Sequence, residues 1–138
     1  MRFELEKELF DEKLSFKELP DAWNQKIHDY LGLTINNDSE GVLQDVHWYT
    51  GLIGYFQSYM LGNLLNAQFY QTMKKNLPVD ELLRTGKVGQ ITDWLKTNVH
   101  SQIKETNDVL VNVTGESLNP DHFVNYLTEK YTYLFEIK

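Results

Sequence analysis

The chain has 138 residues, no cysteine, and 20 acidic against 13 basic side chains, for a formal net charge of −7. This length suits one domain with its own hydrophobic core. The lack of cysteine excludes disulfides, thiolate metal sites and a cysteine nucleophile, and the acidic balance argues against nucleic acid as a partner. The N-terminus is charged and has no apolar segment, and no run of about 18 apolar residues occurs, so we expect no signal peptide, no membrane association and a cytoplasmic location.

The first part of the chain is predicted to form two helices joined by a turn. Residues 3–13 alternate apolar and charged side chains at helical spacing, and no N-cap residue precedes them. Ser15 and Glu18 have the spacing of a capping box, which predicts a short turn. A second helix over residues 20–31 begins with proline in its first turn and ends at Gly32.

The rest of the chain also reads as helical, so we predict an all-α fold. Residues 40–48 form a possible short helix, and residues 52–75 form the longest predicted helix, which ends at Leu77 and Pro78. Further helices are predicted over residues 78–85, 87–99 and 120–134. Residues 109–113 stay open between helix and strand, because valines flank an asparagine there.

The longest predicted helix is unusually apolar. Between residues 41 and 73 the only formally charged side chain is Asp45. Large apolar groups cover every side of the helix from residue 52 to residue 73 and leave no charged stripe, so all of its faces favour burial. Either the other helices wrap it completely, or a second subunit or further sequence covers residues 52–73.

His47 stands apart from the other histidines because it lies in this charge-poor region. Asp45 precedes it by two residues, and Tyr55 and Tyr59 follow. A buried Asp45 would need a polar partner. The group is therefore either a satisfied structural cluster at a helix start or the wall of a site that holds a polar ligand.

The sequence around His47 resembles a known signature. Residues 41–48, GVLQDVHW, resemble the GxxQDxHW motif of the Taq-type zinc metallocarboxypeptidases, and residues 51–63 resemble the stretch that follows it, with Gln57 in place of the usual proline. Residues 19–24, 67–69 and 114–120 also match, so the resemblance covers essentially the whole chain.

The resemblance implies a helical, cleft-shaped enzyme that is typically a homodimer and binds zinc through HExxH and a further glutamate. Neither zinc motif is present here. We therefore expect residues 1–138 to be a single C-terminal helical segment of such a metallocarboxypeptidase, beginning inside a helix. Zinc would act in the full-length enzyme, and no metal is expected to bind this chain alone.

The resemblance also implies roles for the matching residues. In the full enzyme a zinc-bound water attacks the C-terminal peptide bond of a peptide substrate. His47 and Tyr55 would face the carbonyl oxygen and the substrate backbone as the catalytic pair. Gln44 and Asp45 would orient their neighbours, and Tyr59 is a weaker candidate for lining the cleft.

Two functions remain open from the sequence. The first is the substrate-facing part of a zinc carboxypeptidase, inactive by itself. The second is a stand-alone, non-catalytic helical module for binding or oligomerisation, which would cover its apolar surface by self-association.

Overall fold

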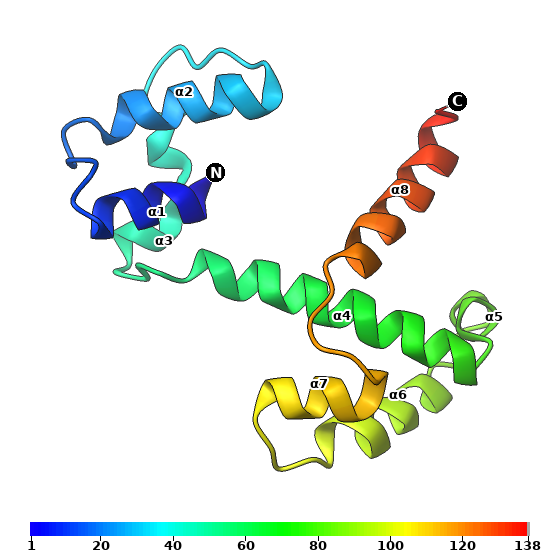
Figure 1. Cartoon of the computed structure of the whole chain (residues 1–138). Coiled ribbons are helices and arrows are strands. Elements are labelled where there is room, and N and C mark those ends of the chain that lie inside the picture. Colours follow the sequence, from blue (N-terminus) through cyan, green and yellow to red (C-terminus); the bar gives the residue numbers. More distant parts are fainter. Residues whose placement is uncertain (138) are drawn as a thin grey trace. The chain divides into compact units, whose positions relative to one another are not determined.

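The computed structural model describes residues 1–137, and within them every regular element is a helix (Figure 1). The prediction of an all-α fold is confirmed. In chain order the elements are α1 (Arg2–Phe10), α2 (Leu19–Leu31), η1 (Val42–Gln44), α3 (Val46–Tyr49), α4 (Phe56–Asn76), α5 (Val79–Arg84), α6 (Gly89–Leu95), η2 (Lys96–His100), α7 (Thr106–Thr114) and α8 (Asp121–Phe135). The chain divides into two compact units, Met1–Tyr59 and the part from Met60 onward.

The core of the first unit is a small apolar cluster between α1 and α2. Leu5 of α1 is completely buried, and it packs with Leu19 and Trp23 of α2. Trp48 of α3 joins this cluster, and its ring meets the Trp23 ring edge to face at 5.8 Å. This aromatic contact packs α3 against α2.

Most helix boundaries in this unit are determined by residues close to them in the sequence. The capping box is confirmed, because the Ser15 hydroxyl donates to Glu18 Oε2 at 2.6 Å and the Glu18 N–H donates back to Ser15 Oγ at 3.3 Å. Gly32 ends α2 in the left-handed region at φ +67, as its position after the helix predicts. Helix α1 begins at Arg2 without a side-chain cap from Met1.

The prediction of one helix over residues 40–48 is wrong. The structure has a short 3₁₀ turn, η1, then an extended Asp45 at φ −81 and ψ 108, and then α3. The Asp45 side chain accepts hydrogen bonds from the backbone N–H groups of His47 and Trp48, and so caps a new helix instead of continuing the old one.

Helix α4 begins four residues later than the sequence predicts. Gly51 and Gly54 both have φ +76, which is incompatible with a right-handed helix, so residues 51–55 form turns instead. At the start of α4 the Gln57 side chain donates from Nε2 to the Gly54 carbonyl. This bond ties the turn to the first residues of the helix.

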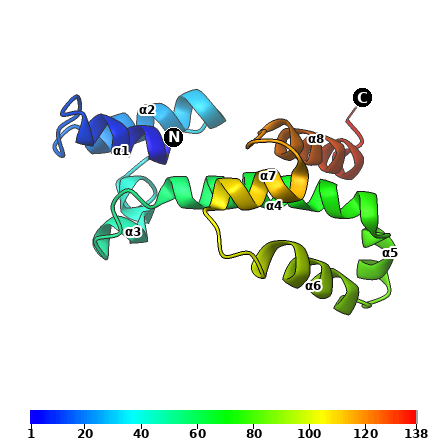
Figure 2. The same ribbon diagram turned by 60° about the horizontal axis from the view of Figure 1, so that its bottom comes forward.

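The second unit contains most of α4 and all elements after it. The chain turns at α5, and α6 runs back along α4 (Figure 2), where Trp94 Nε1 donates to Asn76 Oδ1 at 3.3 Å. The predicted helix over residues 87–99 is α6 followed by the π-helical η2. Residues 109–113, left open by the sequence, lie within α7, where Val109 and Leu110 are buried.

Gln68 connects α4 to the loop between α7 and α8. Its side chain is fully buried. Its Nε2 donates to Thr114 Oγ1 and to the Ser117 carbonyl, each at 3.1 Å, and its Oε1 accepts from the Asn119 N–H at 3.0 Å. One amide thus fixes the path of the chain from the end of α7 toward α8.

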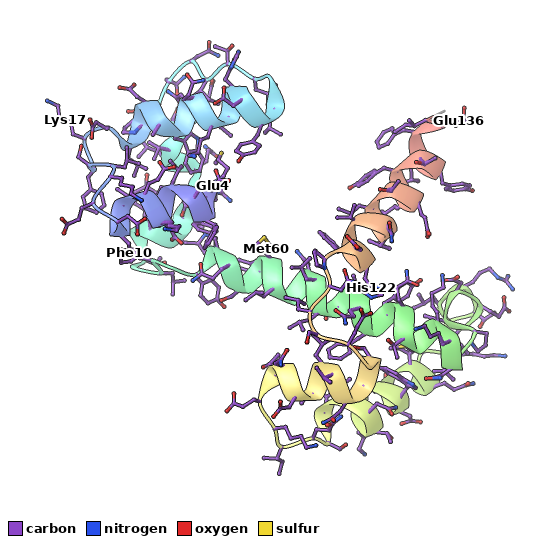
Figure 3. The ribbon with its side chains drawn as sticks, viewed as in Figure 1. Glu4, Phe10, Lys17, Met60, His122 and Glu136 are labelled. Carbon is purple, nitrogen blue, oxygen red and sulfur yellow. The ribbon has the colours of Figure 1, made fainter. Side chains whose placement is uncertain are left out.

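The apolar stretch over residues 52–73 is only partly buried. Ala67, Gln68 and Met73 are buried in the second unit. The larger side chains nearer the start of the stretch are exposed, namely Leu52, Ile53, Tyr55, Tyr59, Met60 and Leu61. Met60, one of these exposed side chains, lies on α4 (Figure 3). None of the helices formed by residues 1–137 is both long and apolar enough to pass through a bilayer.

Candidate functional site

Asp45 is a buried carboxylate at the base of the predicted site. Its side chain is completely shielded from solvent, and its Oδ1 accepts from the His47 N–H at 2.8 Å and the Trp48 N–H at 3.1 Å. Arg2 of α1 approaches the other oxygen, with Nε 3.3 Å from Oδ2. The negative charge is therefore balanced from another helix, as a buried charge requires.

Arg2 is itself held between two aromatic rings. Its guanidinium carbon lies 5.2 Å from the ring centroids of both Trp23 and Phe56. These are cation–π distances. The Arg2 guanidinium therefore connects α1 with α2 and with the first residue of α4, beside the Asp45 carboxylate.

His47 lies between Asp45 and Tyr59. Its Nε2 is 3.2 Å from the Tyr59 hydroxyl, which is hydrogen-bonding distance, whereas its Nδ1 is 3.6 Å from Asp45 Oδ1, which is too long for a good hydrogen bond. The ring also meets the Phe56 ring edge to face at 5.0 Å. The imidazole is thus fixed in place, with one nitrogen turned toward a phenol.

The two tyrosines are arranged around His47. The Tyr55 ring stacks on His47 at 6.4 Å with an interplanar angle of 24°, and the Tyr55 and Tyr59 rings meet edge to face at 5.1 Å. Both side chains keep large exposed fractions, 42% for Tyr55 and 53% for Tyr59. An imidazole and two accessible phenols can donate hydrogen bonds to a carbonyl oxygen or to an oxyanion.

Four of the five predicted site residues therefore come together, and Gln44 does not join them. Asp45, His47, Tyr55 and Tyr59 form the cluster just described. Gln44 ends η1, and its Nε2 donates to the Ser39 carbonyl, so its side chain serves the preceding loop.

Arg2 contacts Asp45 of this cluster and Glu6 contacts residues next to it, and the sequence did not single out either of them. Glu6 is 2% exposed, and its Oε1 accepts from Trp48 Nε1 at 3.0 Å and from the Gly54 N–H at 2.9 Å. The only available signal was their spacing of four residues, which places both on one face of α1. In a segment rich in Glu and Lys that spacing is not distinctive.

The described residues do not form a metal site. Within residues 1–137, no three His, Asp or Glu side chains converge closely enough to hold a metal ion.

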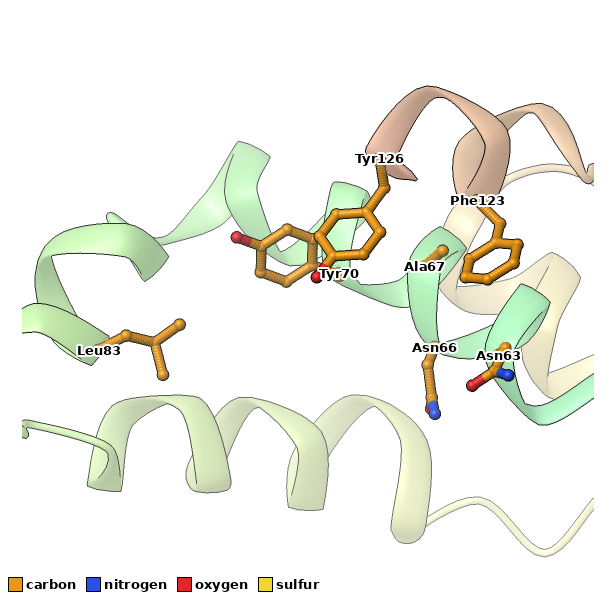
Figure 4. A pocket seen from close by; sticks show the side chains of 7 residues that line it. All are labelled: Asn63, Asn66, Ala67, Tyr70, Leu83, Phe123 and Tyr126. Carbon is orange, nitrogen blue, oxygen red and sulfur yellow. The ribbon is translucent and has the colours of Figure 1, made fainter. Parts of the chain in front are cut away.

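A separate hollow occurs in the second unit, between α4, α5 and α8 (Figure 4). It has a volume of about 390 Å³, and its walls include Tyr70, Phe123 and Tyr126. The Tyr70 hydroxyl donates to Asp80 Oδ1 at 2.7 Å, and the Tyr126 ring meets the Tyr70 ring at 6.2 Å. None of the predicted site residues lines it.

Comparison with known proteins identifies the family. The family model described as "Carboxypeptidase Taq (M32) metallopeptidase" matches residues 1–131. Carboxypeptidase 1 of Bacillus subtilis (strain 168) is 44% identical over 138 residues, and Thermostable carboxypeptidase 1 of Pyrococcus furiosus is 37% identical over 134 residues. These alignments include 98% and 95% of this chain but only 28% and 27% of the relatives, so the chain spans little more than a quarter of their length.

Solved structures give the same result. The M32 carboxypeptidase from Deinococcus radiodurans R1 is 36% identical and superimposes with a TM-score of 0.90, over 99% of this chain and 28% of that one. The Trypanosoma cruzi Metallocarboxypeptidase 1 is 38% identical, with a TM-score of 0.88 over 94% of this chain and 27% of that one. The chain belongs to the carboxypeptidase Taq (M32) metallopeptidase family.

Proposed function

We propose that this chain provides the substrate-facing wall of a metallocarboxypeptidase, an enzyme that removes C-terminal amino acids from peptides. The observation that carries this proposal is the His47–Tyr59 pair at 3.2 Å, with Tyr55 stacked beside it. In this role His47 and Tyr55 contact the carbonyl oxygen and backbone of the peptide. Tyr59 orients the His47 imidazole, and Asp45 fixes the start of α3.

The wall acts by supplying hydrogen bonds to the charge that develops on the carbonyl oxygen. Such donors are most effective when they are already fixed in place. The backbone around His47 is fixed by the Asp45 cap, and the imidazole is fixed by Tyr59. The exposed faces of Tyr55 and Tyr59 leave room for a peptide.

The chain's own residues do not fit the metal that such an enzyme needs. The described part of the chain has no cluster of three possible ligands. We therefore propose that zinc is held by parts of an M32 enzyme that this chain does not span, and that the chain alone releases no amino acids from peptides.

A chimera tests this proposal. The segment of Bacillus subtilis Carboxypeptidase 1 that aligns with this chain is replaced by residues 1–138, and the release of C-terminal amino acids from a peptide is measured with zinc present. We expect activity from the chimera and none from the pure chain. An inactive chimera that folds and binds zinc would contradict the proposal, and so would zinc-dependent activity of the pure chain.

Variants of the chimera then separate the roles. Tyr55→Phe should lower kcat by about 10²–10³-fold with little change in KM, the usual cost of removing one oxyanion donor. Tyr49→Phe is the matched control, because Tyr49 lies in the same stretch and its hydroxyl donates to the Leu43 carbonyl at 3.4 Å. An unchanged kcat for Tyr55→Phe removes Tyr55 from the oxyanion role.

The exposed apolar stretch favours a covering partner. Leu52, Ile53, Met60 and Leu61 are each more than 40% exposed. We propose that the remainder of an M32 enzyme covers residues 52–73. A stable dimer of the pure chain in solution, measured by light scattering, would instead favour the stand-alone oligomerisation module.

A further inference from the structure

Glu6 is a buried carboxylate beside the apolar core of the first unit, and its hydrogen bonds are not explained by packing alone. It lies one residue after Leu5, the fully buried centre of the first unit, and is itself 2% exposed. Burying a carboxylate costs free energy unless hydrogen bonds satisfy it. Here one oxygen, Oε1, accepts two hydrogen bonds, while Oε2 is buried and has no hydrogen-bond partner among the described residues.

The two donors to Oε1 adjoin the two proposed catalytic residues. Trp48 Nε1 donates at 3.0 Å, and Trp48 directly follows His47. The Gly54 N–H donates at 2.9 Å, and Gly54 directly precedes Tyr55. One oxygen atom on α1 therefore fixes the separation between the end of α3 and the start of α4.

Among the described residues, the segment that Glu6 holds is otherwise fixed only by bonds within the turn itself, such as the Leu52 N–H to the His47 carbonyl at 2.9 Å and Gln57 Nε2 to the Gly54 carbonyl. Between α3 and α4 the chain passes through two glycines with φ +76, Gly51 and Gly54, so its backbone is free to take other conformations. Within this segment, Leu52 and Ile53 are half exposed and contribute little burial. The hydrogen bond from the Gly54 N–H to the buried Glu6 carboxylate is consequently a restraint that ties this turn, and Tyr55 after it, to α1.

We propose that Glu6 is the positioning residue for the His47–Tyr55 pair: its Oε1 holds Trp48 and Gly54, and through them it sets the stacking of the Tyr55 ring on the His47 ring. The catalytic task of the His47–Tyr55 pair rests on the proposed function, whereas the contacts of Glu6 lie entirely within this chain.

The test uses NMR on the 138-residue chain and three variants. Glu6→Ala removes the acceptor. Glu6→Gln keeps an oxygen that accepts both bonds and serves as the conservative rescue. Leu5→Ala is the matched control, because it weakens the same core from the neighbouring position and leaves both hydrogen bonds to Glu6, from Trp48 and from Gly54, in place. The readouts are hydrogen exchange of the Gly54 amide relative to the Ile27 amide of α2, and the cross-relaxation between the His47 and Tyr55 rings.

We expect Glu6→Ala to accelerate exchange of the Gly54 amide at least about tenfold relative to the Ile27 amide and to remove the ring-to-ring signal. Leu5→Ala should accelerate both amides together and keep the signal. Glu6→Gln should keep the Gly54 amide within about threefold of the original ratio.

Two results would overturn the proposal. One is an unchanged ratio and an intact His47–Tyr55 signal in folded Glu6→Ala, and the other is loss of the signal in Leu5→Ala to the same degree. If Glu6→Ala does not fold, the proposal depends on Glu6→Gln, where loss of the signal despite a native fold counts against it. All these outcomes are independent of peptidase activity, so failure here is distinguishable from failure of the chimera.

Discussion

Replacement of Gln68 by alanine is expected to destabilise the second unit more than any exposed substitution on α4. The Gln68 side chain is fully buried and makes three hydrogen bonds of 3.0–3.1 Å to the segment between Thr114 and Asn119. Alanine removes all three and leaves the Asn119 N–H and the Ser117 carbonyl without their partner in a partly buried place.

The magnitude follows from the bonds that are lost. A net contribution of about 1 kcal/mol per hydrogen bond gives about 3 kcal/mol of unfolding free energy for the three bonds. Water entering the loop can satisfy part of this loss, and the small cavity left by the side chain adds to it. We therefore expect a decrease of about 2–4 kcal/mol.

Urea denaturation and hydrogen exchange measure the effect. The matched control is Gln71→Ala, the same substitution three residues later on α4, where the described residues give the side chain no hydrogen bond and we expect a change below about 0.5 kcal/mol. In Gln68→Ala the Asn119 amide should also lose its protection. Equal stability of the two variants, with the Asn119 amide still protected, would refute the reasoning.

Three further predictions follow from single contacts. Asp45→Ala should lower the unfolding free energy of the first unit by about 2 kcal/mol, and Asp45→Asn should cost clearly less, because asparagine can still cap α3; equal urea midpoints by tryptophan fluorescence would contradict this. Gly54→Ala should cost about 1 kcal/mol from its φ of +76 alone, since the added Cβ would meet Gln57 Nε2 at an ordinary 3.7 Å, and an unchanged melting temperature would argue against it. Hydrogen bonds from the His122 ring, and secondly from Asn119, hold the pKa of Glu116 below its usual value. The Glu116 carboxylate therefore stabilises the fold at pH values above its ordinary pKa, and this stabilisation is lost as the pH falls through the lowered pKa. In an NMR titration His122→Ala should raise the pKa of Glu116, and no movement of the midpoint would rule out the pairing.

The features predicted correctly from the sequence are those decided within a few residues. The proline at position 20, Gly32 after α2 and the capping box of Ser15 and Glu18 act on their own backbone. The single helix predicted over residues 40–48 was wrong because the choice there depends on the Asp45 side chain, which favours a cap over a continuous helix.

The site was predictable only in part for the same reason. His47, Tyr55 and Tyr59 stand near one another in the sequence, so their grouping needed only a turn and the start of a helix. Arg2 contacts Asp45, and Glu6 contacts Trp48, across more than 40 residues of sequence, and no local pattern marks such contacts. These contacts depend on which helices pack against each other. Hydrophobic periodicity shows which face of a helix is buried, but not which other helix it contacts.

The contacts of α1 also decide how the site could be moved between proteins. All four clustered residues lie within a stretch of 15 residues, from Asp45 to Tyr59, which invites grafting as a short peptide. The two side chains that hold this stretch in shape, Arg2 and Glu6, are left behind by such a graft. A graft that keeps the geometry of the site accordingly needs the whole first unit, Met1–Tyr59. A graft of residues 45–59 alone would carry the same side chains without the contacts that position them.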